Sequence, residues 1–296
     1  MFWSTIKLGG KFCPLRLMGA KMINICFCSD SNYLKPLELA IFSIVVNCED
    51  KVSFHIIKTD SFSELNILEL SLTYDFEVTF YDLDITLPSK GRFSKAMYGR
   101  LYLDVILPTS IDKVIYLDCD LVVNKSISSL WNTDISSFAI GAVSEENSII
   151  KQSLMRKYSL NEYFNSGVLL INLNKVRSEF IFRKVLSLLN DSNASFEYPD
   201  QDALNIVLDN NWHALSNIYN YTGLDFSPES VVIHYALSKP WDNDLNMNSY
   251  FYHEYNRVYP LRIPFFKNDF NKKTRLNIFK EKLVYPIRLI YWRWLK

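Results

Sequence analysis

Short apolar segments alternate with amphipathic ones between residues 22 and 117, and this alternation restricts the fold more than any other feature of the sequence. Their periodicity predicts strands at 22–28, 53–57, 77–81 and 113–117. It predicts helices between them at 36–46, 63–72 and 94–107. This order is typical of an α/β fold with a mostly parallel sheet, in which ligands bind at the carboxyl ends of the strands.

The pattern changes after residue 130, although no internal repeat or flexible linker interrupts it. Further strands are expected at 138–143, 167–171 and 231–235, and helices at 176–189 and 200–208. We therefore expect one domain over residues 22–264, in which 144–162 and 242–260 form variable loops.

Composition excludes several classes of protein. The chain has 296 residues, of which 49% are apolar, and 32 basic residues balance 32 acidic ones. An apolar, aromatic-rich chain of this length is expected to fold around a core rather than remain disordered. A zero net charge gives no overall attraction to nucleic acid, so no nucleic-acid partner is expected.

Basic residues concentrate at the two ends of the chain. Residues 1–22 contain four basic residues and no acidic one, and residues 266–296 contain nine basic and two acidic residues among many aromatic ones. We expect 265–296 to be a basic, amphipathic helical tail that binds an anionic membrane surface. Alternatively, the aromatic residues of this segment pack on the domain and its basic side chains face water.

Cysteine usage and the N-terminal segment indicate a cytoplasmic protein. The five cysteines have neither zinc-ligand spacing nor the density of a disulfide framework, which favours a reducing compartment. The sequence contains no run of 18 uncharged apolar residues, so no membrane-spanning helix is predicted. Gly9, Gly10 and Lys11 interrupt any apolar signal segment, and a reading frame that starts at Met22 would explain residues 1–21 as a non-native extension.

Two carboxylates directly follow the predicted strand 113–117. Asp118 and Asp120 flank Cys119, and residues i and i+2 of an extended chain project to the same side. Both carboxylates can therefore bind one divalent cation, which could bridge a diphosphate. Two solvated acids in a turn are the alternative. An EF-hand loop is excluded, because Val123 and Ser129 occupy the positions of its glycine and glutamate.

His234 at the end of the strand VVIHY is the third candidate metal ligand, although such a histidine can also be a core residue. Two carboxylates and an imidazole suit Mn²⁺ better than Ca²⁺, with Mg²⁺ as another candidate ion. Lys239 and Trp241 follow and offer a cation for phosphate and a flat wall for a sugar or base. Polar clusters at 165–167 and 200–202 could contact a ligand or form an ordinary turn and helix start.

The order of these motifs resembles the family-8 retaining glycosyltransferases, which include bacterial lipopolysaccharide galactosyl- and glucosyltransferases. The segments FCSDSNY, SKAMYGRLYLDVILP, KVIYLDCDLVVNKSISSLW, YFNSGVLLINLNKVR, YPDQDALN and HYALSKPW carry the resemblance, which covers residues 22–241. It implies a GT-A nucleotide-sugar-binding fold, a UDP-sugar donor and Mn²⁺. It also implies a glycan or glycolipid acceptor and a location at the inner face of the cell membrane.

The resemblance assigns roles to positions that match the family's motifs. Contacts with uracil and ribose are implied for Cys28, Asp30, Asn32 and Tyr33. Contacts with the rest of the donor are implied for Arg100, Cys119, Glu145, Asn165 and Lys239, with Lys239 on the diphosphate. The implied metal ligands are Asp118, Asp120 and His234. Asp200 and Gln201 match the catalytic positions, and Gln201 is implied to lie beneath the anomeric carbon.

One departure from the family pattern concerns the phosphate. The family usually reads His-Tyr-x-Gly-x-x-Lys-Pro-Trp, whereas the segment from His234 to Trp241 lacks the glycine, carries Leu237 and is one residue shorter. Because glycine permits close backbone approach, we expect Lys239 to reach the diphosphate differently.

Two other functions remain open. A haloacid-dehalogenase-like phosphatase also carries two spaced aspartates after a strand, but it requires threonine where Val122 stands. A catalytically inactive sugar-nucleotide-binding protein is the third interpretation, and an intact set of candidate metal ligands disfavours it.

Overall fold

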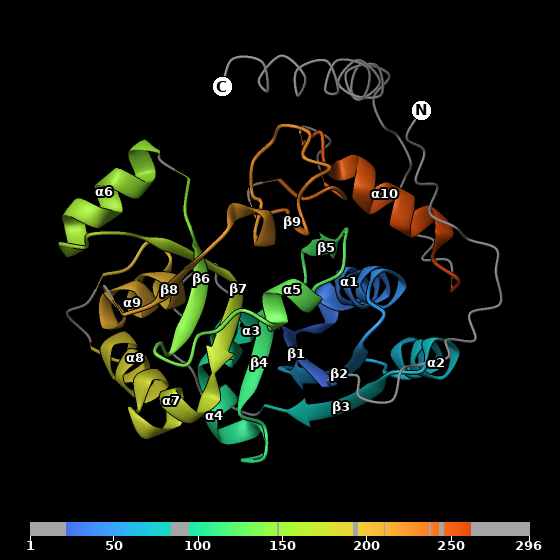
Figure 1. Cartoon of the computed structure of the whole chain (residues 1–296), viewed down its shortest axis with the longest axis horizontal. Coiled ribbons are helices and arrows are strands. Elements are labelled where there is room, and N and C mark those ends of the chain that lie inside the picture. Colours follow the sequence, from blue (N-terminus) through green and yellow to red (C-terminus); the bar gives the residue numbers. More distant parts are fainter. Residues whose placement is uncertain are drawn as a thin grey trace.

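The computed structural model describes residues 22–83, 95–146, 148–191, 195–209, 211–236, 238–242 and 246–261. Its main feature is a seven-stranded sheet in the order β3-β2-β1-β4-β7-β6-β8 (Figure 1). The first four strands in the chain are mutually parallel, as the sequence predicts. Their bounds are Met22–Ser29 for β1, Lys51–Lys58 for β2, Glu77–Asp82 for β3 and Lys113–Leu117 for β4.

The second half of the chain extends this sheet. Strand β7 (Phe164–Asn172) pairs antiparallel with both β4 and β6 (Ile140–Ser144), and β8 (His213–Leu215) runs parallel to β6. The sheet is therefore mostly parallel, which confirms the prediction. A separate antiparallel pair consists of β5 (Leu121–Val123) and β9 (Val232–His234).

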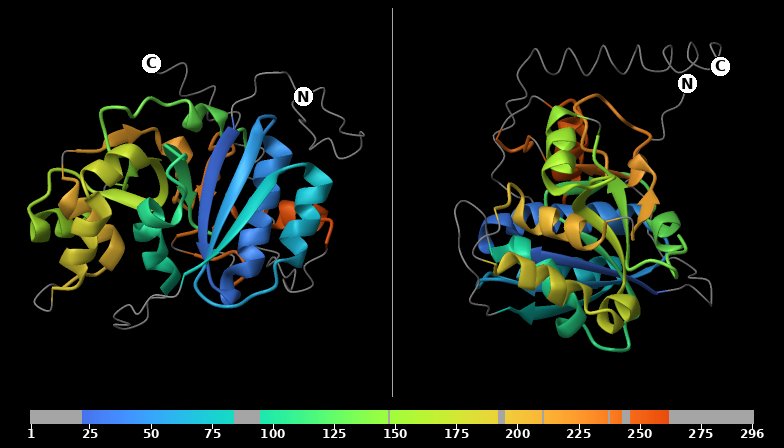
Figure 2. Two further views of the ribbon diagram at one scale, coloured as in Figure 1. Left: turned by 90° about the horizontal axis from the view of Figure 1, so that it is seen from below. Right: turned by 90° about the vertical axis from the view of Figure 1, so that its left-hand side faces the viewer.

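Helices cover both faces of the main sheet (Figure 2). On one face, Ile25 and Phe27 of β1 pack with α1 (Leu34–Asn47) and α2 (Leu65–Tyr74). On the other, Cys26 and Cys28 pack with α3 (Lys95–Gly99), α7 (Leu173–Ser178), α8 (Ile181–Leu189) and α9 (Pro199–Val207). Alternate side chains of β1 are thus buried on opposite faces, which explains why an interior parallel strand is a continuous apolar run.

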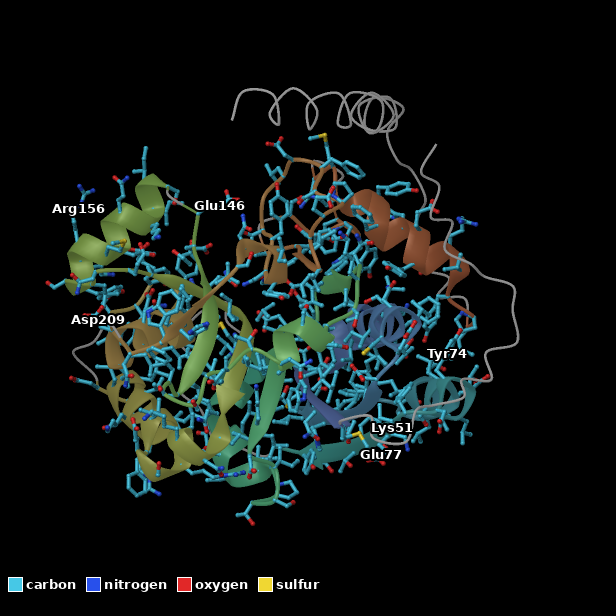
Figure 3. All side chains as sticks on the ribbon, in the orientation of Figure 1. Lys51, Tyr74, Glu77, Glu146, Arg156 and Asp209 are labelled. Carbon is cyan, nitrogen blue, oxygen red and sulfur yellow. The ribbon has the colours of Figure 1, made fainter. Side chains whose placement is uncertain are left out.

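A third apolar cluster joins α10 (Ser249–Val258) to the small sheet. Tyr252 and Tyr255 of α10 pack with Phe42 of α1, Val122 of β5 and Ile233 of β9. Burial of these large side chains stabilises the β5–β9 pair, which is too short to persist by its own hydrogen bonds. Charged side chains such as Lys51, Glu77 and Arg156 remain exposed at the periphery (Figure 3).

Two predicted helices are each divided. The segment predicted as 94–107 forms α3 (Lys95–Gly99), the 3₁₀ turn η2 (Arg100–Tyr102) and α4 (Leu103–Ile106). The segment predicted as 176–189 forms α7 (Leu173–Ser178) and α8 (Ile181–Leu189). Phe180, with φ 55°, separates them, because a residue in the left-handed region ends the regular helix.

The interpretation of 144–162 and 242–260 as loops is wrong for their central residues. They contain α6 (Ile149–Tyr158) and α10, and Ser148 caps α6 by accepting a hydrogen bond from the Lys151 backbone N–H. The structure also contains α5 (Ser128–Trp131), α9 (Pro199–Val207) and the 3₁₀ turns η1 (Ser31–Tyr33) and η3 (Asn217–Tyr219). Segment α9 confirms the helix predicted at 200–208.

Residues 1–21, the tail 265–296 and Leu237 lie outside the described residues, so the interpretations placed on them stay predictions. The same holds for the division of the chain into a domain and two extensions. Across the described part of the chain, we find no helix with the length and apolar character needed to cross a membrane.

Burial of His55 predicts a stability that depends on pH. His55 lies in β2, with Nδ1 3.1 Å from the Tyr81 hydroxyl and Nε2 3.2 Å from Asn24 Oδ1. Burial lowers the pKa of His55 to about 4. In the unfolded chain this pKa is about 6.5, so the unfolded state binds a proton first as the pH falls.

Between pH 6.5 and 4 this histidine should therefore remove about 3 kcal/mol from the free energy of unfolding. Urea denaturation of the wild type and His55→Gln across this range measures the effect. The variant should lose less stability on acidification than the wild type does. Parallel curves for the two proteins would contradict the assignment.

Candidate active site

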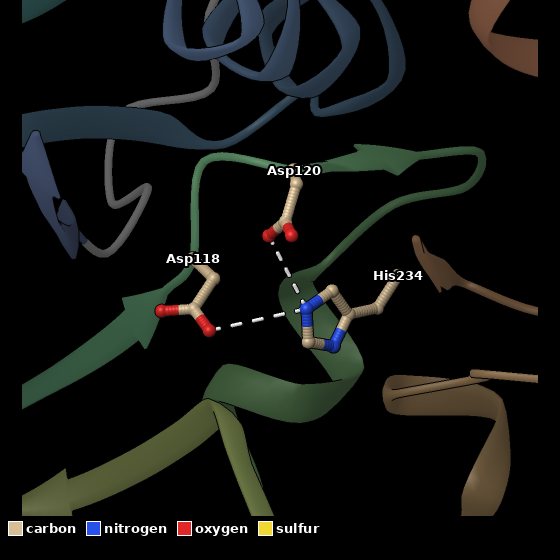
Figure 4. A group of neighbouring side chains, drawn as sticks. All are labelled: Asp118, Asp120 and His234. Atoms are coloured by element: carbon tan, nitrogen blue, oxygen red, sulfur yellow. Dashed lines mark ion pairs between the residues drawn. The ribbon is translucent and has the colours of Figure 1, made fainter. Parts of the chain in front are cut away.

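The end of β4 positions the first aspartate. The Asp118 backbone N–H donates to the Gly167 carbonyl on β7 at 2.8 Å. Its Oδ1 accepts from the Tyr116 hydroxyl at 2.9 Å and from Arg100 Nη2 at 2.8 Å. These two donors fix the carboxylate, so that Oδ2 is the oxygen directed toward His234 (Figure 4).

The pairing of β5 with β9 brings the other two residues to Asp118. Leu121 is opposite His234, and the Tyr235 backbone N–H donates to the Asp120 carbonyl at 2.8 Å. His234 Nε2 then lies 3.3 Å from Asp120 Oδ1 and 3.9 Å from Asp118 Oδ2. One ligand atom from each residue lies within 4.8 Å of the others, so the expected metal ligands do converge.

The donor set fits a divalent cation. Two carboxylates and one imidazole form a mixed oxygen and nitrogen set, whose side chains are 24%, 10% and 4% exposed for Asp118, Asp120 and His234. The partial exposure of Asp118 leaves one side accessible to a ligand. Burial opposes ionisation of Asp120, but His234 and Lys239 outweigh it and hold the pKa of Asp120 well below its usual range.

Lys239 contacts this cluster directly. Its ammonium forms an ion pair with Asp120 Oδ2 and also donates to the Tyr235 carbonyl at 2.8 Å. Lys239 thus supplies the positive charge that a cation would otherwise supply beside Asp120. From the sequence we expect Lys239 to contact a diphosphate. In the structure its ammonium contacts Asp120, one of the three candidate metal ligands.

Arg100 is a buried link between two parts of the site. Its guanidinium bonds Asp118, lies 3.1 Å from Asp200 Oδ2 through Nε, and donates to the Ser166 carbonyl at 2.6 Å. Burial opposes its charge, but Asp118, Tyr116 and Asp200 raise the pKa of Arg100 above its usual value. In the described structure Arg100 therefore holds acidic side chains in place, rather than projecting toward an open space.

Asp200 and Gln201 begin helix α9, whose first residue is Pro199. Asp200 is buried, and burial raises its pKa to about 6 despite the opposing charge of Arg100. Gln201 Oε1 accepts from the Ser166 backbone N–H at 2.9 Å, while its Nε2 donates to the Tyr163 hydroxyl at 3.1 Å. The amide is therefore fixed with a known orientation beside β7.

The neighbouring Asp202 has a structural function. Its carboxylate accepts hydrogen bonds from the hydroxyls of Tyr158 and Tyr163 and from the backbone N–H groups of Glu197 and Tyr198. It thereby ties the approach to α9 to the end of α6 and to the residue before β7. Asp200 and Gln201 therefore contact residues of the site, and Asp202 supports the helix that carries them.

Asn165 and Glu145 form a hydrogen bond next to Gly167. Asn165 Nδ2 donates to Glu145 Oε1 at 3.2 Å, and Asn165 Oδ1 accepts from the Gly167 backbone N–H at 2.9 Å. The site requires a residue without a side chain at position 167, and glycine is the residue there. A Cβ there would lie 2.2 Å from His234 Cε1 and 2.9 Å from Asp118 Oδ2.

The residues expected at the nucleobase lie in and beside the first turn after β1. Asp30 Oδ1 accepts from the backbone N–H groups of Asn32 and Tyr33, so this oxygen caps η1. Tyr33 makes an edge contact with Trp241 at 6.1 Å between ring centroids. Burial, with Asp120 nearby, raises the pKa of Tyr33.

Cys28 and Cys119 are buried, and Cys119 Sγ donates to the Cys28 carbonyl at 3.4 Å. This bond joins the end of β1 to the aspartate pair. Asn32 is exposed in η1, away from the hydrogen bonds that connect the metal cluster.

Sequence reasoning missed Asn220. This buried residue follows η3 and places Oδ1 2.9 Å from His234 Nδ1. It stands in the segment SNIYNY, which has no metal-ligand spacing or strand periodicity, so local sequence gave no signal for it. Tyr116, Ser166 and Tyr163 also support the site, and each lies within or next to a segment already associated with it.

Comparison with known proteins agrees with this geometry. A family model described as glycosyl transferase family 8 matches residues 24–244. A Haemophilus influenzae protein with the provisional name of a glycosyltransferase is 33% identical over 219 residues, which is 70% of this chain and 65% of that relative. The lipopolysaccharide 1,2-glucosyltransferase of Escherichia coli K12 is 29% identical over 251 residues, covering 75% of this chain and 73% of the relative.

A solved structure supports the fold. The crystal structure of the galactosyltransferase LgtC with donor and acceptor sugar analogues has a TM-score of 0.67 and 25% sequence identity to this chain. The match covers 79% of this chain and 95% of LgtC. The expected GT-A fold is thereby confirmed.

Gly167 provides a test of the metal cluster. Gly167→Ala should weaken Mn²⁺ binding at least about tenfold, because its methyl group must displace the His234 ring. Gly141→Ala is the matched control, since a Cβ there meets Ile135 and Leu215 at 3.3 Å and no residue of the cluster. Isothermal titration with Mn²⁺ measures both variants. Equal affinities in two folded variants would show that His234 does not bind the ion.

Proposed function

The chain belongs to glycosyltransferase family 8, and we propose that it transfers galactose or glucose from a UDP-sugar to a hydroxyl of a glycan or glycolipid such as lipopolysaccharide. The observation that carries this proposal is the convergence of Asp118, Asp120 and His234 at the carboxyl end of β4. Relatives named as lipopolysaccharide glucosyl- and galactosyltransferases support the class of acceptor.

The proposed ion at this cluster is Mn²⁺, with Mg²⁺ as a second candidate. A bound cation would neutralise negative charge on the departing UDP diphosphate. Lys239, whose ammonium already lies at Asp120, can contact the same diphosphate, and Arg100 holds Asp118 as a ligand. Tyr33 and Trp241 offer aromatic surface for the uracil.

The proposed chemistry proceeds with retention at the anomeric carbon. Gln201 is a neutral amide with an ordered oxygen, so it can stabilise positive charge at that carbon while being a poor nucleophile. Asp200, held by Arg100, positions this end of α9 beside the donor sugar. The departing diphosphate can accept the proton of the acceptor hydroxyl on the same face, and no protein base is then required.

A haloacid-dehalogenase-like phosphatase is the second candidate, and the structure disfavours it. Val122, at the position where that chemistry requires threonine, is fully buried in β5 and offers no hydroxyl. All three candidate ligands lie within reach of one ion, which disfavours an inactive sugar-nucleotide-binding protein.

Incubation with Mn²⁺ and a panel of UDP-sugars, followed by measurement of UDP release, tests the proposed function. Asp120→Asn should reduce kcat/KM at least about 100-fold, corresponding to about 3 kcal/mol of transition-state stabilisation. Asp134→Asn is the control, because Asp134 is exposed and caps only the turn at Ser136. Near-normal turnover by Asp120→Asn, or release of phosphate from the substrates in place of UDP, would contradict the proposal.

We further propose that residues 265–296 attach the enzyme to the inner face of the cell membrane, where a lipid-linked acceptor is reached. The net charge of this basic, aromatic segment supports attraction to anionic lipid. Truncation after Pro264 should abolish co-sedimentation with anionic vesicles and preserve turnover on a soluble acceptor. Vesicle binding that is unchanged by the truncation would refute this role.

A further inference from the structure

An amide network behind the metal cluster fixes the orientation of His234. Asn220 is 3% exposed and lies where the chain runs beside β9, since the His234 backbone N–H donates to the Tyr221 carbonyl at 2.9 Å. Its Nδ2 donates to Asn165 Oδ1 at 2.8 Å, and its Oδ1 lies 2.9 Å from His234 Nδ1. Asn220 therefore connects a candidate metal ligand to a residue beside the proposed sugar site.

The direction of every bond in this network follows from one backbone group. The Gly167 backbone N–H can only donate, so the Asn165 atom 2.9 Å away must be the oxygen Oδ1. Asn165 then presents Nδ2 to the Glu145 carboxylate, which can accept it. The Asn220 atom that faces Asn165 Oδ1 must be its nitrogen, which leaves the oxygen of Asn220 facing His234.

An amide oxygen accepts hydrogen bonds and cannot donate them, so Nδ1 of His234 must carry the proton. Without a metal, a second proton on Nε2 can be donated to Asp120. When a metal displaces that proton, the lone pair is on Nε2, which is the nitrogen that faces Asp118 and Asp120. In the other tautomer, Nε2–H would donate to Asp120 and a lone pair on Nδ1 would face Asn220 Oδ1. That arrangement would lose the buried hydrogen bond and block the metal ligand.

We propose that Asn220 is a positioning residue that holds His234 in the tautomer able to bind the divalent cation. This inference rests on the metal site of the proposed function. Partners of this kind behind a metal-binding histidine commonly change metal affinity by about 10–100-fold. The network also ends at Asn165 and Glu145, so the orientation of the metal ligand and the geometry of the proposed sugar site depend on the same side chains.

The first test measures Mn²⁺ affinity without nucleotide, by electron paramagnetic resonance of the free ion. Asn220→Ala should weaken binding at least about tenfold. Asn220→Asp should lose less affinity than Asn220→Ala, because one carboxylate oxygen still accepts from His234 Nδ1–H although the other can no longer donate to Asn165 Oδ1. Asn172→Ala is the control for general loss of a partly buried amide, since Asn172 Oδ1 accepts from the Lys175 backbone N–H at the end of β7 that lies opposite Lys113, away from the cluster.

Circular dichroism establishes that each variant is folded. Wild-type affinity in folded Asn220→Ala, or an equal loss in Asn220→Asp, would overturn the inference while leaving the proposed function intact. A wild-type protein that binds no Mn²⁺ would contradict both this inference and the proposed function.

A second measurement needs no variant. Nitrogen-15 NMR of the histidine rings in the full chain loaded with Zn²⁺, a diamagnetic substitute for Mn²⁺, reports which nitrogen of His234 carries the proton. Protonated Nδ1 and metal-bound Nε2 are expected. Metal bound through Nδ1, or a proton on Nε2, would overturn the inference even if Asn220→Ala failed to fold.

Discussion

The site depends on the antiparallel pairing of β5 with β9. The chain leaves the main sheet at Asp118, and three residues later it pairs with a strand far along the sequence, where Leu121 lies opposite His234. This short pair is held by burial of aromatic side chains from α10. Without it, two carboxylates would remain at the sheet edge with no imidazole beside them, and the mixed ligand set would not exist.

Charge compensation explains why so many acidic groups can be buried together. Arg100 bridges Asp118 and Asp200, and Lys239 pairs with Asp120. An isolated buried carboxylate would be costly, and each of these three carboxylates has a cationic partner within reach. A cation bound at Asp120 would compete with Lys239 for the carboxylate. The ammonium would then be available to a diphosphate, which would couple metal binding to recognition of the proposed donor.

The sequence predicted the parallel half of the fold and the aspartate pair well, because apolar periodicity and position after a strand are local signals. Strands β5 and β8, of three residues each, are too short for periodicity to reveal. The division between α7 and α8 was missed because Phe180 has no sequence signal for its left-handed conformation. His234 could be associated with the aspartates through family resemblance, whereas Asn220 could not, since its contacts come from strand pairing distant in sequence.

We propose that Asp118, Asp120 and His234 hold a divalent cation in contact with the donor diphosphate. Phosphorus-31 NMR of UDP bound to the protein, with Mn²⁺ added, measures that contact directly, because a paramagnetic ion broadens the resonances of nearby phosphorus nuclei. Both phosphate resonances should broaden strongly with the wild type and much less with His234→Ala. Equal broadening in the two proteins, or sharp resonances in the wild type, would contradict the account.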